Sequence, residues 1–120
     1  MDIRNAKTIS PVASEHGEII YELFGSSAGG SQAHSLAHIV IPPGKASLKH
    51  YHPAAEESYS ILSGSARMEM DGETARLGPG DSIMITPPHV HQIFNVGEDD
   101  LVMLVVCAPA WTPDISVFVE

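Results

Sequence analysis

Six side chains that can bind a metal ion lie in two short stretches of this sequence. In the first, "HYHPAAEE", one residue separates His50 from His52, and Glu56 and Glu57 follow. Side chains at positions i and i+2 of a strand point the same way, so the two imidazoles can face one point. In the second, "PPHVHQIFN", His89 and His91 follow a pair of prolines. Neutral imidazole and carboxylate are ligands of divalent first-row metals, and three or four protein ligands leave positions for water or substrate.

The composition argues against several classes of partner. Six basic residues against fifteen acidic ones give a net charge of -9 over 120 residues. No stretch gathers Lys and Arg into a patch that neutralises phosphates, so we expect neither nucleic acid nor a membrane as a partner. The single cysteine, Cys107, allows no intramolecular disulfide, and the N-terminus does not read as a signal peptide. No segment approaches the roughly 18 unbroken apolar residues of a membrane helix, so we expect a cytoplasmic protein.

The elements that must position the candidate ligands are short strands. Ten glycines and nine prolines punctuate runs rich in Ile, Val, Leu, Met and aromatic residues, which is typical of an all-β domain. Asp71-Gly72 between two alternating runs predicts a two-residue hairpin. The apolar run "LVMLVV", with apolar residues at consecutive positions, predicts a strand covered on both faces. No helix longer than a turn or two is expected, and the predicted strands are 17–24, 34–41, 58–64, 66–70, 73–77, 81–85, 91–95, 100–108 and 115–119.

Two spaced motifs give the sequence a resemblance to the cupin superfamily. An isolated H-x-H pair can equally be two histidines bonded to backbone groups, because a motif match alone is weak. Here the full first cupin motif is present over 44–64, and the second is matched over 80–95 at Gly80, His91 and Asn95. The residues of the first are Gly44, His50, His52, Glu57 and Gly64. The resemblance implies one domain over 1–120 with an all-β jelly-roll barrel, also called a double-stranded β-helix.

The resemblance also implies that His50, His52, Glu57 and His91 form a metal site inside the barrel. The six-residue gap to Gly64 favours Glu57 over Glu56 as the carboxylate ligand. Strand alternation agrees, because it places Glu57, Tyr59 and Ile61 on one face.

The second motif departs from the family pattern at two positions. Thr86 and Pro88 stand where the family usually has proline and glycine. Proline fixes φ and removes an N–H donor, so we expect the turn before His91 to differ from one built on glycine.

Two further residues are candidates for catalysis. Tyr59 shares a face with Glu57, so its phenol can bond substrate or act as an acid, or the ring can simply form part of an aromatic wall. His89 is either a proton carrier at the cavity mouth or a residue of a surface turn. We expect Cys107 to be buried and unreactive, and His16 to be solvated.

The ligand set does not select a reaction. Our first hypothesis is a metalloenzyme acting on a small oxygen-bearing organic substrate, dioxygenase-like, with iron or manganese favoured and zinc, nickel or copper as the other candidates. The second is a non-redox isomerase, lyase or cyclase. The third is a non-catalytic cupin that binds a sugar or an effector.

The flanking segments 1–24 and 108–120 carry apolar side chains, among them Ile19, Tyr21, Trp111 and Phe118. Packing them against a second copy would cover this surface, so we expect a homodimer. Trp111 is alternatively a cap at one end of the barrel.

Overall fold

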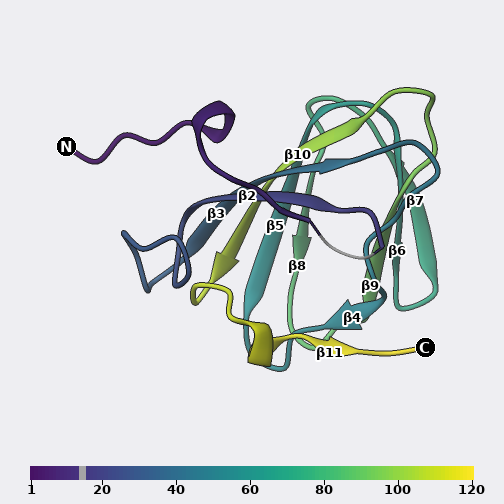
Figure 1. Ribbon diagram of the computed structural model, residues 1–120. Helices are drawn as coiled ribbons and strands as arrows, with labels where there is room; N and C mark the ends of the chain where they lie inside the picture. Colours follow the sequence, from purple (N-terminus) through teal and green to yellow (C-terminus); the bar gives the residue numbers. More distant parts are fainter. Residues whose placement is uncertain (14–15) are drawn as a thin grey trace.

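The computed structural model describes residues 1–13 and 16–120, which form two facing antiparallel sheets (Figure 1). The first sheet has six strands in the order β1 (Val12–Ala13), β2 (Ile19–Phe24), β3 (Ser35–Ile41), β10 (Leu101–Ala108), β5 (Glu56–Ser63) and β8 (Ser82–Ile85). The second has five, in the order β11 (Val117–Phe118), β4 (His50–Tyr51), β9 (His91–Asn95), β6 (Ala66–Met70) and β7 (Glu73–Leu77). The expected all-β jelly-roll architecture is confirmed.

The inner faces of the two sheets pack against each other and form the core. Burial alternates along β3, β5 and β10, as the two-residue period of a strand requires. The fully buried side chains come from both sheets, and they include Ile41, Ile61, Met68, Ile93, Leu101 and Met103. Three buried polar residues, His52, Glu57 and His91, lie in the same interior.

Two predicted turn features hold these strands in register. Asp71 and Gly72 have φ values of 48° and 84° and join β6 to β7, which confirms the predicted hairpin. Gly64, the last residue of the first motif, has φ of 93°, and a Cβ there would lie 2.7 Å from the carbonyl oxygen of Asp100. Only glycine fits this close approach of two segments of the chain without strain.

Asn95, the last residue of the second motif, fastens a loop. Its side-chain amide donates to the carbonyls of Ile41 and Asp99, both at 2.8 Å, and its Oδ1 accepts from the N–H of Gly97. The buried amide therefore has its hydrogen bonds satisfied, which makes it costly to replace.

Most predicted strands are present, with differences at the ends. The expected strand over 58–64 begins two residues earlier, at Glu56, so Glu57 lies within β5. The segment expected to be a strand over 115–119 is split between the short 3-10 helix η2 (Pro113–Ile115) and β11. A second short 3-10 helix, η1, spans Ala6–Thr8. Among the described residues, no helix is long and apolar enough to cross a membrane.

Candidate metal centre

The four predicted ligands meet at one point between the two sheets. His50 on β4 pairs directly with His91 on β9, and their ring centroids lie 4.3 Å apart. His52 follows β4, and Glu57 reaches the cluster from β5 in the facing sheet. One ligand atom from each of these four residues lies within 4.8 Å of the others. This cluster is a candidate metal site, and it joins residues that are 41 positions apart in the chain, from His50 to His91.

Backbone carbonyls fix the tautomer of all three imidazoles. The Nδ1 atoms of His50, His52 and His91 lie 2.8, 3.1 and 3.0 Å from the carbonyl oxygens of Leu48, Ile115 and His89, respectively. A carbonyl only accepts, so each Nδ1 must carry the hydrogen. In the neutral ring, each Nε2 then has a free lone pair, which is the state that a metal ligand needs.

The arrangement of donor atoms fits a cation. Nε2 of His52 and Nε2 of His91 lie 3.2 and 3.3 Å from the same carboxylate oxygen, Oε1 of Glu57. The His91 Nε2 atom is buried and, within the described part of the chain, has no partner in hydrogen-bond geometry. Lone pairs that face a carboxylate oxygen repel one another unless a proton or a cation lies between them. A divalent metal would satisfy both nitrogens and the carboxylate together.

The pKa values follow from burial and from this crowding. Burial and, to a smaller extent, the nearby His91 lower the pKa of His50 to about 4, so His50 stays neutral near pH 7. Burial would raise the pKa of Glu57, but the hydrogen bond from His52 and the neighbouring imidazoles lower it to about 2. Burial also acts to lower the pKa of His52, yet its hydrogen bond to Glu57 raises it overall. A metal that displaces the proton shared by His52 and Glu57 therefore meets one carboxylate and three neutral imidazoles.

A cavity of about 310 Å³ adjoins the cluster, and both His50 and Glu57 line it. Its floor is the inward face of the six-stranded sheet, where β2, β3, β5 and β10 each contribute side chains. The residues that line the cavity include Glu18, Ile20, Ile39, Tyr59, Val105 and Trp111. This volume lies at the lower end of the range for small-molecule sites.

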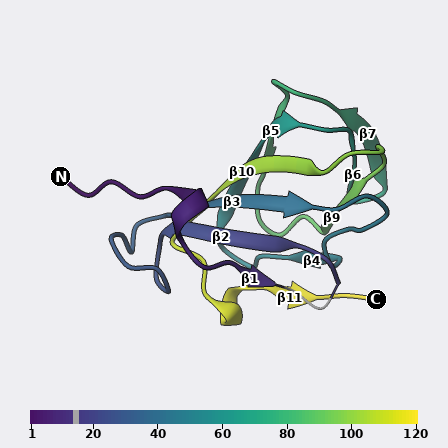
Figure 2. The same cartoon turned by 45° about the horizontal axis from the view of Figure 1, so that its top comes forward.

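The C-terminal segment forms one wall of this cavity. It runs beside the cluster because β11 pairs with β4, placing Phe118 opposite His50 (Figure 2). The Trp111 indole N–H donates to Ser116 Oγ at 2.9 Å, and the Ile115 carbonyl accepts from His52. Trp111 and Phe118 therefore line the cavity of their own chain.

Glu18 and His16 also line the cavity, and the sequence reasoning missed both. His16 was expected to be solvated, but its Nε2 lies 3.7 Å from the Glu18 carboxylate, and its side chain is 33% exposed. The Glu18 side chain is 16% exposed. Burial and the charge of Glu57 raise the pKa of Glu18 to about 7. The only available signal was the alternation of Glu18, Ile20 and Glu22 along one face of β2.

The two catalytic candidates lie in different places. Tyr59 is buried in the cavity, with its ring centroid 6.1 Å from that of His91, and burial and Glu57 hold its pKa well above the usual value. His89 lies at the surface, where Nδ1 pairs with the Asp71 carboxylate and lowers its pKa. The structure thus brings Tyr59 to the cluster and leaves His89 outside the cavity.

Three other predictions concern residues near the site. Glu56 is exposed, as expected for the carboxylate that is not a ligand. Cys107 is buried, and burial together with Glu57 raises its pKa to about 12, so its thiol is unreactive as predicted. In the altered turn of the second motif, the His89 N–H donates to the Thr86 carbonyl at 3.1 Å, and the Pro87–Pro88 peptide bond is cis.

A jelly-roll barrel with three histidines and one glutamate gathered at a cavity defines a class of small metal-binding β-barrels. Residues 37–107 match the cupin domain family, so this chain belongs to the cupins. Its relatives include the uncharacterized protein MJ1618 of Methanocaldococcus jannaschii, with 33% identity over 93% of this chain and 90% of the relative. Another is the tetracenomycin polyketide synthase protein TcmJ of Streptomyces glaucescens, with 31% identity over 74% of this chain and 61% of TcmJ.

Solved structures show the same fold. The polyketide cyclase RemF of Streptomyces resistomycificus superposes with a TM-score of 0.82 and 19% identity, over 100% of this chain and 86% of that one. A predicted oxalate decarboxylase of Thermotoga maritima gives a TM-score of 0.81 and 24% identity, over 89% and 98%. These similarities extend the assignment of the fold to almost the whole chain.

Proposed function

We propose that this cupin is a metal-dependent enzyme that acts on a small oxygen-bearing organic molecule without a change of oxidation state. The observation that carries the proposal is the cluster of His50, His52, Glu57 and His91 in the wall of a mostly apolar cavity. A divalent metal bound there would supply Lewis acidity to an oxygen of the substrate. Manganese or iron is the favoured ion, with zinc, nickel or copper as the alternatives.

The residues of the chain itself bind and orient the substrate. Apolar side chains of β2, β3 and β10 would hold its carbon skeleton and exclude water. Tyr59 lies beside Glu57 and would remain a protonated phenol, so it can donate a hydrogen bond to a substrate oxygen. The relatedness to a polyketide synthase protein supports an isomerase, lyase or cyclase type of reaction.

A dioxygenase is the second candidate. The neutral three-histidine, one-carboxylate donor set suits iron and manganese, and it leaves coordination positions free in an octahedral arrangement. Dependence of turnover on dioxygen separates this reaction from the first.

The test starts with protein purified without chelator, whose metal content is measured by elemental analysis. We expect about one metal ion per chain in the wild type and none in His52→Ala. Oxygen uptake and product formation are then screened with oxygen-bearing substrates. Turnover without oxygen uptake would support the proposal, and turnover with oxygen uptake would favour a dioxygenase. Tight ligand binding without any product would favour a binding protein, and absence of metal from the wild type would overturn all metal-dependent versions.

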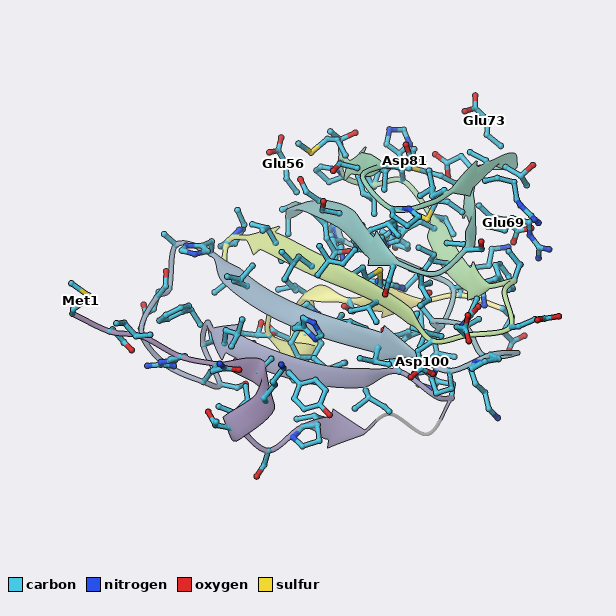
Figure 3. The ribbon with its side chains drawn as sticks, turned by 90° about the horizontal axis from the view of Figure 1, so that it is seen from above. Met1, Glu56, Glu69, Glu73, Asp81 and Asp100 are labelled. Atoms are coloured by element: carbon cyan, nitrogen blue, oxygen red, sulfur yellow. The ribbon has the colours of Figure 1, made fainter. Side chains whose placement is uncertain are left out.

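We also propose that the protein is a homodimer that associates through the outer face of the six-stranded sheet. The outward-facing residues of β3 and β10 are half-buried or exposed, include no Asp, Glu, Lys or Arg, and are mostly apolar: Leu36, His38, Val40, Val102, Leu104 and Val106. This is the second apolar face predicted from "LVMLVV", and Tyr21 of β2 packs edge-on against His38 on it. Figure 3 looks onto this sheet, with the charged Glu56 at its margin. Because the chain carries a net charge of -9, a second copy of this uncharged face is the partner that adds least repulsion.

A further inference from the structure

The wall of the cavity formed by β2 carries acidic residues where a binding site for anions would carry basic ones. Glu18, directly before β2, alternates with Ile20 and Glu22 on the strand, and all three line the cavity. The Glu22 carboxylate is held by a turn, because its Oε2 accepts from the Ala28 N–H at 2.6 Å. The Glu18 carboxylate lies 3.7 Å from His16, and its side chain, 16% exposed, lines the cavity, where a ligand can reach it.

The charge at this site limits the charge of the ligand. Among the described residues that line the cavity there is no Lys or Arg, while three carboxylates are present: Glu18, Glu22 and Glu57. The negative charge of Glu57 would leave a site that holds a divalent ion with one net positive charge. A small dicarboxylate would bring two negative charges next to Glu18 without a cation to compensate the second, and an unpaired charge in such a site is costly.

The remaining walls favour an apolar skeleton. Ile20, Ile39, Leu48, Val105 and Phe118 surround the space, and the Trp111 ring borders it. A two-carbon diacid would leave most of the roughly 310 Å³ of this cavity unfilled and would make no use of these walls. A flat or cyclic molecule would bury its carbon atoms against them.

We propose that the cavity selects an uncharged, largely apolar ligand that carries a phenol or enol hydroxyl beside a carbonyl, and that Glu18 accepts a hydrogen bond from this hydroxyl. The inference rests on the proposed function in one respect, since the carbonyl side of the ligand faces the metal centre. Glu18 is then a specificity-determining residue, and small dicarboxylates such as oxalate are excluded.

The chain offers a direct readout, because Trp111 is its only tryptophan and lines the cavity. Zinc-loaded wild-type protein is titrated at about pH 8, above the Glu18 pKa of about 7, so that the carboxylate is ionised. The ligands are 2′-hydroxyacetophenone, 2′-methoxyacetophenone and oxalate, and tryptophan fluorescence is followed. A hydrogen bond to a charged acceptor is worth about tenfold or more in affinity. We therefore expect the hydroxy ketone to bind at least about tenfold more tightly than its methoxy analogue. Oxalate should produce no saturating change.

Two variants assign the selectivity to Glu18. Glu18→Gln should reduce the preference for the hydroxyl at least about threefold, because a neutral acceptor forms a weaker bond than a charged one, and should improve binding of oxalate. Glu56→Gln removes the same charge from the exposed end of β5 and should change neither property. Thermal melting and zinc content are measured for every sample.

The inference fails if wild-type protein binds oxalate as tightly as the hydroxy ketone, or binds neither ketone, while keeping one zinc ion per chain. It also fails if Glu18→Gln retains the wild-type preference for the hydroxyl. Should Glu18→Gln not fold, the comparison of the three ligands on the wild type still decides the outcome. Loss of zinc from the wild type would instead count against the proposed metal-dependent function, so the two failures are distinguishable.

Discussion

Replacing His52 by alanine should abolish the stabilisation of the fold by metal. The His52 side chain is 2% exposed and links three parts of the molecule: β4, the Glu57 carboxylate at 3.2 Å and the Ile115 carbonyl at 3.1 Å. Its removal takes away one of four ligands and leaves Glu57 buried with fewer donors. The variant should therefore bind metal weakly and be less stable even without metal.

The two effects differ in size and can be separated. A metal at a free concentration of 100 times its Kd stabilises the folded chain by about 2.7 kcal/mol. For a domain of 120 residues, each kcal/mol of stabilisation raises Tm by about 4 °C. Metal should therefore raise the wild-type Tm by about 11 °C. In the absence of metal, the loss of the His52 hydrogen bonds should lower the stability by about 1–3 kcal/mol.

The assay is thermal unfolding followed by circular dichroism, with chelator and with manganese or zinc in excess. His34→Ala is the matched control, because His34 is exposed and its side chain contacts Ser31 rather than the cluster. The control should keep the full metal-dependent rise in Tm, whereas His52→Ala should show none. An equal rise in both variants, or no rise in the wild type, would refute the reasoning.

Three further predictions concern pH, strain and assembly. Because the pKa of His50 falls from 6.5 to about 4 on folding, the unfolded chain binds a proton there that the folded chain does not. The free energy of unfolding of the metal-free protein should therefore decline by up to about 3 kcal/mol as the pH falls from 6.5 to 4. Urea titrations of His50→Gln should show a shallower decline than the wild type. An equal decline in the two proteins would be evidence against this cause. Gly64→Ala should cost more than about 2 kcal/mol, because φ is positive and the Cβ meets the Asp100 carbonyl. The control Gly29→Ala, with φ of 84° but no atom within 4 Å, should cost less, and equal losses in urea denaturation would contradict the steric argument. Leu104→Glu should convert a dimer into a monomer of 12.8 kDa in analytical ultracentrifugation, while a wild type that is already monomeric at micromolar concentration would contradict the proposed interface.

The candidate metal ligands were predictable because they fall in the two cupin motifs, and local geometry agrees with that assignment. His50 and His52 are related by the period of a strand, and alternation along β5 places Glu57 on the buried face together with Tyr59. The spacing of the second motif in the family assigned His91. The resemblance to the family took the place of knowing how these distant segments pack.

The inward face of β2 was harder to predict, because its pattern is the reverse of the usual one. A strand at the surface normally turns its apolar side inward, which for this strand would bury Ile19 and Tyr21. In the structure, Glu18, Ile20 and Glu22 line the cavity, and Tyr21 packs edge-on against His38 on the outer face. Acidic side chains that face the cavity and apolar side chains on the outer face invert the pattern. A single sequence does not show which side of the sheet holds the cavity.

The C-terminal wall could not be predicted for a different reason. The hydrogen bond from His52 to the Ile115 carbonyl joins residues 63 positions apart. Apolar residues in a terminal segment are equally compatible with a subunit contact, which is where Trp111 and Phe118 were expected. Only the pairing of β11 with β4 decides that these side chains face the site of their own chain.

The division between the predictable and the unpredictable parts has a chemical meaning. All four candidate ligands lie within residues 37–107, the part that matches the family, whereas Glu18, Trp111 and Phe118 lie outside it. Part of the ligand-facing wall can therefore change while the four candidate ligands are kept, because β2 and residues 109–118 contribute none of the four. Cupins with the same ligand set but different substrates should then differ chiefly in the segments that correspond to β2 and to residues 109–118. Exchanging these two segments for those of another cupin should alter ligand selectivity in the tryptophan fluorescence assay, while the metal content stays at one ion per chain. A loss of metal after the exchange would show that the walls and the metal centre are not separable.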